Sequence, residues 1–218
     1  ILISCSPFHA EHIPLARTHR ALHLAEEIFG PSRVMFYQAQ WAAQIAAFSE
    51  DEPVPLQSYL DAYGQKEGGQ MLWQGYGLIP GGRAGYRLGD LIPAQPAAAF
   101  RNQNCAHDIL YAAHSHFDLY GNFISGFCGG LAVGSWRHLP ALLEDFDREA
   151  YPPLTGILIH DGPYGLYELA IRHYGYIPLK AGYAGKCHLC VDVRRHLTTQ
   201  TDFADSSELQ PAHFYNAI

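Results

Sequence analysis

The sequence has few positive charges and no long apolar run. Only 14 of its 218 residues are Lys or Arg, the formal net charge is −7, and no basic run occurs. Because a phosphate backbone attracts clustered positive charge, we expect no nucleic-acid partner. No stretch approaches the roughly 18 consecutive apolar residues of a membrane span, so no membrane partner is expected. The short apolar start at residues 1–5 has no positive flank and is not typical of a signal peptide.

The sequence also lacks the even cysteine count of a secreted disulfide scaffold. It has five cysteines, and four of them fit a metal site, so we expect a reducing, cytoplasmic compartment. An initiator Met is missing as well, and the chain opens inside a run that is typical of a buried strand. We therefore expect the chain to be a fragment of a longer protein.

Four of the cysteines are the most informative residues. Cys187 and Cys190 form a CxxC pair, whose spacing lets the chain curl around one metal, and glycines flank Cys128. With Cys105 they supply four thiolates, enough for a tetrahedral sulfur site that holds either an iron–sulfur cluster or zinc. The glycines would let backbone N–H groups approach the sulfur atoms. Cys5 lies in a different neighbourhood and is left over.

Other interpretations of these residues stay open. Free cysteine is among the most buried residue types, so the four could simply be core residues. His107 and His188 lie beside cysteines, and either could replace one of them as a ligand. A redox dithiol at Cys187 and Cys190 would need a thioredoxin-like βαβ context, which the surrounding pattern lacks.

The apolar pattern predicts alternating strands and helices in the first part of the chain. Strands are expected at residues 1–6, 33–37 and 74–79, with a helix that starts behind Pro14 and ends at Gly30. Shorter helices are expected at residues 42–48 and 59–64. This order implies right-handed crossovers and a parallel sheet, and three such strands would make half of a barrel.

The composition changes after Leu91, where Pro93 and Pro96 flank an Ala-rich linker, and we place a domain boundary near Pro93. Beyond it, a turn joins a strand at residues 114–119 to one at 123–124. Helices are expected at residues 139–146 and 164–174, and the CxxC segment opens a last one.

Two turns are candidate binding sites. His9 follows the first predicted strand, at the carboxyl end where α/β folds place ligands. Gly81-Gly82-Arg83 follows the third, and its free N–H groups and arginine could hold an anion such as a carboxylate. The alternatives are a turn histidine hydrogen-bonded to the backbone and a solvated arginine beside a glycine turn.

These segments together resemble radical S-adenosylmethionine (radical SAM) enzymes. Residues 3–14, with Phe-His after a polar strand end, resemble a mid-barrel strand and turn of that family, and residues 80–84 are similar to a later Gly-Arg-Ala turn. Residues 118–128 resemble the Asp-x-x-Gly-Asn…Cys hairpin that opens SPASM or twitch auxiliary-cluster domains. Residues 187–194 resemble the closing CxxC helix of such a domain. In this order the resemblances cover nearly the whole chain.

The resemblance implies an α/β fold in two parts. Residues 1–92 would be the C-terminal strands and helices of a partial (β/α)6 radical SAM barrel, and residues 93–218 a small α+β auxiliary domain. In the complete protein, a 4Fe–4S cluster would cleave SAM to a 5′-deoxyadenosyl radical that abstracts a hydrogen from a substrate. That substrate, a small molecule or a peptide, is not identified by any motif.

The resemblance also implies roles for particular residues. Ser4, Ser6 and His9 would line the SAM or substrate side of the strand end, and Arg83 would help to hold the SAM carboxylate or the substrate. An auxiliary 4Fe–4S cluster would be held by four thiolates, from Cys105, Cys128, Cys187 and Cys190. The alternative is a non-catalytic module in which the same four residues bind structural zinc.

The sequence departs from the family in three ways. The defining CxxxCxxC motif and the glycine-rich motif after the second barrel strand are absent, and the six-cysteine ladder of a full SPASM domain is missing. One auxiliary cluster is therefore the most that we expect. The chain alone is not expected to cleave SAM, and its expected partner is the missing N-terminal half of the same protein.

Overall fold

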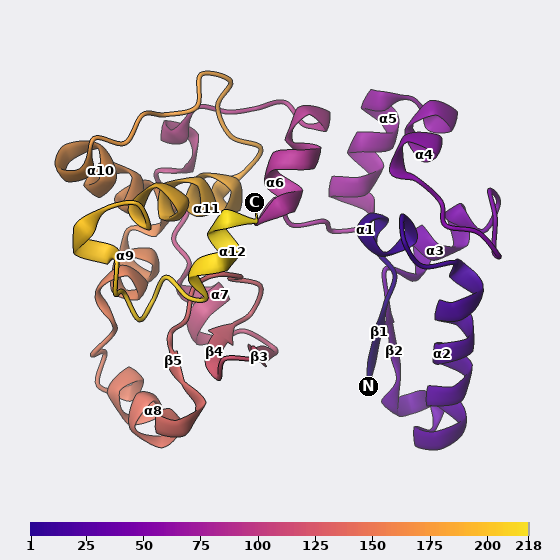
Figure 1. The fold of residues 1–218 in the computed structure, drawn as a ribbon, viewed down its shortest axis with the longest axis horizontal. Helices are drawn as coiled ribbons and strands as arrows, with labels where there is room; N and C mark the ends of the chain where they lie inside the picture. The colour runs from indigo at the N-terminus through magenta and orange to yellow at the C-terminus, as the bar shows by residue number, and fades with distance from the viewer. Residues whose placement is uncertain (218) are drawn as a thin grey trace. The chain divides into compact units, whose positions relative to one another are not determined.

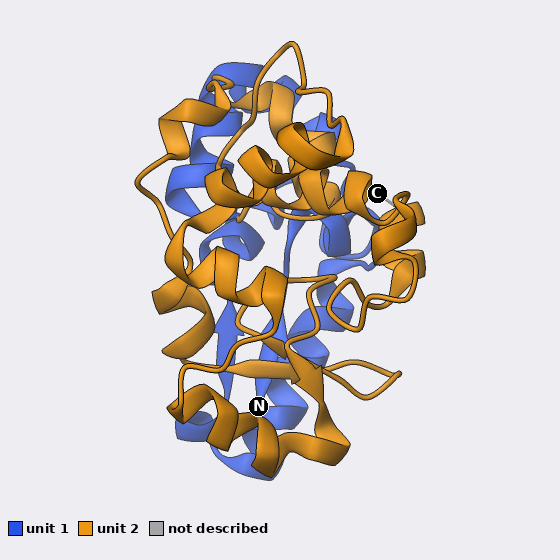
Figure 2. Cartoon of the chain, turned by 90° about the vertical axis from the view of Figure 1, so that its left-hand side faces the viewer, with its two compact units in different colours: residues 1–78 blue, residues 79–218 orange. Residues whose placement is uncertain are grey.

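The computed structural model describes residues 1–217 and separates the chain into two compact units, Ile1–Leu78 and Ile79–Ile218 (Figure 2). Both units mix helices with a small sheet, two-stranded in the first and three-stranded in the second, which confirms the mixed α and β content. Neither sheet closes into a barrel within residues 1–217. The boundary expected near Pro93 falls inside the second unit. No helix in these residues has the length and apolar character needed to cross a membrane.

The first unit begins with a strand–helix–strand repeat (Figure 1). Strands β1 (Leu2–Ser4) and β2 (Met35–Tyr37) pair in parallel, as predicted. Helix α2 (Leu15–Phe29) connects them; it begins after Pro14 and ends at Gly30, whose φ of 84° suits glycine. Proline at the start and glycine at the end explain why these limits were predictable from the sequence.

Short helices and an aromatic core complete the first unit. Trp41 and Tyr59 are fully buried, and their ring centroids lie 4.6 Å apart in an edge-on arrangement. Beyond α2, the unit contains one short turn and five further helices: η1 (Pro31–Arg33), α1 (Pro7–Ala10), α3 (Ala39–Ile45), α4 (Leu56–Tyr63), α5 (Gln65–Gln70) and η2 (Met71–Gly75).

The prediction of a third strand at residues 74–79 is wrong. Helix η2 instead continues α5 as a wider turn, and the chain then runs on without regular structure. Leu72 and Tyr76 are both buried, at the i,i+4 spacing of a helix, and Gly77 has a φ of 63° that interrupts an extended conformation. A short apolar run between glycines does not by itself distinguish a strand from a buried helical turn.

The second unit contains the predicted hairpin. Strands β3 (Ser115–Phe117) and β4 (Asn122–Ser125) pair antiparallel, and β5 (Gly134–Ser135) adds to β4. The Asp118 carboxylate fixes the turn, since it accepts hydrogen bonds from the backbone N–H groups of Tyr120 (2.8 Å) and Asn122 (2.9 Å).

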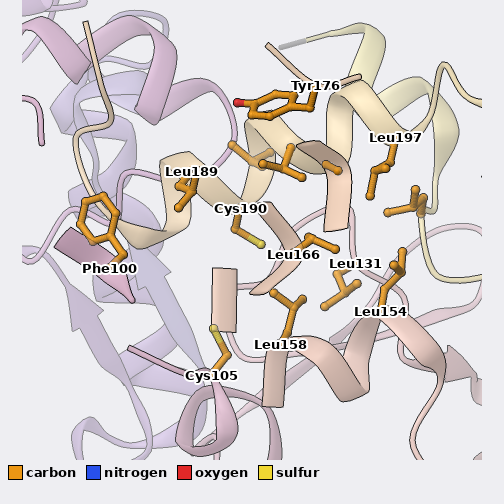
Figure 3. Packing of buried hydrophobic residues seen from close by; sticks show 14 of the residues in the cluster. Phe100, Cys105, Leu131, Leu154, Leu158, Leu166, Tyr176, Leu189, Cys190 and Leu197 are labelled. Atoms are coloured by element: carbon orange, nitrogen blue, oxygen red, sulfur yellow. The ribbon is translucent and has the colours of Figure 1, made fainter. Parts of the chain in front are cut away.

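Helices pack around a single apolar cluster in this unit (Figure 3). Helix α11 (Lys186–Leu197) lies against α10 (Gly162–Tyr174), and its Leu189, Val191 and Val193 are fully buried. The CxxC segment therefore does open a helix, as predicted. The other helices and turns are α6 (Arg83–Leu88), η3 (Gly89–Leu91), η4 (Ala97–Phe100), α7 (Ala106–Leu110), η5 (Trp136–His138), α8 (Leu139–Asp147), α9 (Pro153–His160), η6 (Thr201–Phe203) and α12 (Ala212–Asn216).

A buried glutamate caps α9 from a distant part of the chain. Both carboxylate oxygens of Glu208 accept hydrogen bonds, from the backbone N–H groups of Leu154 (2.9 Å) and Thr155 (2.7 Å) and from the Thr155 hydroxyl (2.8 Å). These are N–H groups that the first turn of a helix leaves without intrahelical partners. Glu208 thus ties the C-terminal loop to the core by charge-assisted hydrogen bonds.

Replacing Glu208 with Ala should lower the free energy of unfolding of the second unit by about 2–4 kcal/mol, because two buried N–H donors lose their acceptors. Glu208→Gln, which retains one acceptor oxygen, should cost roughly half as much. Urea unfolding followed by circular dichroism measures both, with exposed Asp205→Ala as the matched control. Equal stability of the Ala variant and the native chain would contradict this capping role.

The two-stranded sheet should make the chain self-associate. Parallel sheets are normally covered on both faces, yet Leu2 and Met35, paired across this sheet, are 58% and 61% exposed. We expect the mass measured by light scattering to rise with concentration, and the double variant Leu2→Lys/Met35→Lys to reduce that rise. Exposed Ile177→Lys in the second unit is the control, and a native chain that stays monomeric throughout would refute the prediction.

Candidate metal centre

One cavity of about 390 Å³ in the second unit is lined by all four of the predicted cysteine ligands, Cys105, Cys128, Cys187 and Cys190. They come from three separate segments of the chain, so only the tertiary structure brings them together. Leu131, Leu158 and Pro163 contribute apolar walls, and Asp108, Lys186 and Arg194 are the charged residues of the lining.

Helix α11 supplies two of the thiols. Cys187, Cys190 and Arg194 are spaced three and four residues apart, which places them on one side of a helix, and all three line the cavity. The neighbouring buried side chains of α11 belong to the apolar core, so the core fixes the rotation of the helix. The CxxC spacing presents both sulfur atoms to the cavity for this reason.

Cys105 and Cys128 come from the two other segments. The backbone N–H of Cys105, just before α7, donates to the carbonyl of Leu158 in α9 at 2.8 Å. Cys105 and Cys190 lie among the apolar side chains of the core, as Figure 3 shows. Cys128 lies in the loop after β4, where its N–H donates to the Ser125 carbonyl at 3.3 Å.

The glycines around Cys128 make room for aromatic side chains. A Cβ on Gly130, whose φ is 76°, would lie 2.4 Å from a ring carbon of Phe214, and the Gly129 N–H donates to the Phe127 carbonyl at 2.8 Å. The Gly129 N–H is therefore paired with a carbonyl, and the approach of N–H groups from the flanking glycines to the sulfur atoms stays a prediction. The glycines allow Phe214 and Tyr215 of α12 to pack on the loop that carries Cys128.

Burial disfavours the thiolate form of three of the four thiols, those of Cys105, Cys128 and Cys187. Burial, followed by the neighbouring thiols, raises the pKa of Cys128 to about 11 and that of Cys187 to about 12, against the lowering effect of nearby cations. Burial, followed by the charge of Cys190, also raises the pKa of Cys105. Because thiolates are the species that bind metals, metal binding here has to release protons, and affinity for a metal should increase with pH.

Positive charge faces these thiols. Arg194 is buried, with 4% of its surface exposed, and Lys186 is partly buried, with its ammonium 2.6 Å from an Asp108 carboxylate oxygen. The Arg194 Nε atom is buried without a hydrogen-bond partner among the described residues. A donor set of four thiols beside a buried arginine without an acidic partner is suited to a bound group that carries net negative charge once the thiols have ionised.

The two histidines considered as substitute ligands lie differently. His107 lines the cavity and is exposed, so it lies at the mouth. His188 is buried but is not part of the lining; its Nδ1 accepts a hydrogen bond from the Ala184 N–H at 3.2 Å. Its ring packs edge-on against Tyr86 and Tyr183 on another side of α11. The hypothesis that His188 replaces a cysteine therefore has no geometric support.

The predicted SAM-side residues of the first unit make local contacts. Ser6 caps α1, and its hydroxyl lies 3.0 Å from Nδ1 of His9, which also accepts from the Ser6 N–H at 3.3 Å. This capping box supplies the turn role that was the alternative for His9. Ser4 ends β1, and the neighbouring Cys5 is buried, where burial raises its pKa to about 11.

Arg83 begins α6 and is exposed, and it is not part of the cavity lining, although Gly81 and Gly82 before it are. Arg83 belongs to the second unit and Ser4, Ser6 and His9 to the first. The cavity thus brings together the four cysteines and the glycine turn, and none of the four predicted SAM-side residues.

Sequence reasoning missed the charged part of the lining. Its spacing of four residues from Cys190 and seven from Cys187 places Arg194 on the same helix face, and this signal could have found it from the sequence. Lys186 and Asp108 had no comparable signal, because the contact between them joins residues 78 positions apart.

Two further observations bear on the site. No three His, Cys, Asp or Glu side chains among residues 1–217 are placed to hold one metal ion. A larger and more open groove of about 710 Å³, along α9 and α10, is lined by none of the cysteines.

No family model, curated protein or solved structure matches the chain, so the assignment of function depends on this geometry and on the sequence.

Proposed function

We propose that the second unit holds an auxiliary 4Fe–4S cluster and that the chain is part of a radical SAM enzyme. The observation that carries this proposal is one cavity lined by four thiols from three segments, with Cys187 and Cys190 from one helix. Cysteine thiolates are the ligands of such clusters. The cysteine order along the chain and the hairpin before Cys128 agree with the resemblance described above.

The shape of the site favours a cluster over a single zinc ion. In a structural zinc site all four sulfur atoms lie about 2.3 Å from the same ion, so the ligands converge on one point. A 4Fe–4S cluster is larger, and each thiolate binds a different iron. The cavity of about 390 Å³ that the four thiols line has room for a group larger than one ion, which favours the cluster.

The parallel pair of strands supports the proposed barrel. Strands β1 and β2, joined by α2, form the strand–helix–strand repeat from which (β/α) barrels are built. In the complete enzyme, Ser4, Ser6 and His9 would face SAM or the substrate at the carboxyl end of β1, and Arg83 would bind a carboxylate. These assignments come from the resemblance.

When bound, the auxiliary cluster would supply one-electron transfer or an anchoring point for the substrate. The residues of this chain would bind it, exclude water and set its charge environment. Leu131, Leu158 and Pro163 give the cavity its apolar walls, and Cys105 and Cys190 are buried. Exclusion of water protects such a group and strengthens the electrostatic effect of nearby charges.

Anaerobic reconstitution with iron and sulfide should give a brown protein with about four iron and four sulfide per chain. Replacing Cys187 or Cys190 with Ser should remove most of this iron and lower the melting temperature of the second unit, because ligand binding and local folding are coupled. Iron analysis, absorption near about 400 nm and thermal unfolding measure these effects.

Cys5→Ser is the matched control, since Cys5 belongs to the first unit and is absent from the cavity lining. It should load iron as the native chain does. A colourless protein that binds one zinc would establish the structural zinc alternative. Full iron content in the Cys187→Ser and Cys190→Ser variants would rule out the proposed ligands.

The reconstituted chain should form no 5′-deoxyadenosine above background when incubated with SAM and a strong reductant. Reductive cleavage needs an iron with an open coordination position, and four cysteine ligands on one cluster leave none. Liquid chromatography of the quenched reaction measures the product, with a complete radical SAM enzyme as the positive control. Turnover by this chain would show that one of the four cysteines is not a ligand.

A further inference from the structure

Arg194 is a buried cation whose partners are all neutral. Its Nη1 donates to the hydroxyl of Tyr215 at 2.7 Å, and both Nη atoms donate to the carbonyl oxygen of Gly129 at 3.1 Å. No Asp or Glu side chain in residues 1–217 forms an ion pair with it. Its Nε has no partner within the same residues, and the side chain lines the four-cysteine cavity.

Burying a guanidinium without a negative partner is costly, since the charge loses its hydration and gains only dipoles in return. Four neutral thiols carry no negative charge, so they do not offset this loss of hydration free energy. Four thiolates around an iron–sulfur core carry net negative charge and would provide the missing counter-charge. The arrangement is thus electrostatically complete only when the proposed group is bound.

Lys186 provides a contrast within the same lining. Its ammonium donates to the Asp108 carboxylate at 2.6 Å and to the Asn104 carbonyl at 3.0 Å, and its side chain is 25% exposed. Its charge is already compensated by Asp108 and is partly screened by water. Arg194 has neither form of compensation, so its field acts mainly on the cavity.

Arg194 also joins two of the segments that carry ligands. It extends from α11, which bears Cys187 and Cys190, to the carbonyl of Gly129, the residue after Cys128. Tyr215 reinforces this link, since its hydroxyl accepts from Arg194 and donates to the Gly130 carbonyl. One side chain therefore provides both a fixed position for the Cys128 loop and a positive charge beside it.

We propose that Arg194 raises the reduction potential of the bound cluster by stabilising the extra negative charge of its reduced state, while it positions the Cys128 loop. This inference rests on the proposed function. Reduction adds one electron from an external donor to the cluster. No bond forms and no bond breaks in this step. Net charge, nearby donors and burial are the levers that set such potentials.

The test compares Arg194→Gln with Arg194→Lys in the full chain after reconstitution. In a dithionite titration followed by electron paramagnetic resonance, Arg194→Gln should lower the equilibrium constant for reduction at least about tenfold, which is about 59 mV for a one-electron couple. Arg194→Lys keeps the charge and should lie closer to the native value than Arg194→Gln. Arg172→Gln, on the exposed face of α10, should match the native chain.

A purely structural role for Arg194 predicts a different pattern. Both substitutions break the paired hydrogen bonds to Gly129, so loss of positioning alone would lower iron content equally in the two variants and leave the potential of the loaded fraction unchanged. An unchanged potential in loaded Arg194→Gln would overturn the inference and leave the proposed cluster intact. A native chain that binds no cluster would overturn both.

Failure of a variant to load iron is also informative. If Arg194→Gln stays empty while Arg194→Lys loads with a potential near the native one, the charge itself is required and the inference is supported. If neither variant loads while the native chain does, the guanidinium geometry and not the charge is what the site needs, and the inference is wrong.

Discussion

The packing of α11 against the core of the second unit is the constraint on which the candidate site depends. Leu189, Val191 and Val193 are fully buried, and this fixes the rotation and height of the helix. With the helix held, the remaining face can present Cys187, Cys190 and Arg194 only to the cavity. On another side Asp192 accepts hydrogen bonds from the hydroxyls of Tyr86 and Tyr176, which oppose any rotation. Apolar burial and a polar anchor thus position the chemistry together.

Each of the other two cysteines has its own attachment to this core. Cys105 is held through its backbone N–H by Leu158 of α9, and α9 in turn is capped by Glu208 from the C-terminal loop. The Cys128 loop is held through the carbonyls of Gly129 and Gly130, which accept from Arg194 and Tyr215 respectively. Binding of one group by the four cysteines would join all three segments, so the site and the fold of the second unit would stabilise each other.

Charge distinguishes this cavity from an ordinary apolar core that contains cysteines. Buried thiols alone are common and need no ligand. A buried arginine without an acidic partner is uncommon, because proteins seldom leave a buried charge unpaired. The thiols can become negative when they bind a metal, and Arg194 then has its counter-charge without any carboxylate. The cysteines and the arginine are therefore best understood as parts of the same site, with Lys186 and Asp108 as a compensated pair beside it.

The sequence by itself determined those features that depend on neighbours along the chain. Pro14 and Gly30 set the limits of α2, Asp118 and Asn122 specified the hairpin turn, and the CxxC spacing put two thiols on one helix face. The sequence also indicated Cys105 and Cys128 as ligands, because with the CxxC pair they make up four thiols and because glycines flank Cys128. Only the tertiary structure decided that these four thiols line one cavity, that His188 turns away from it, that residues 74–79 form no strand, and that Arg194 reaches the loop of Cys128. Local patterns fix which conformations a segment can adopt, whereas burial against residues far away along the chain decides which of them forms and which charges meet.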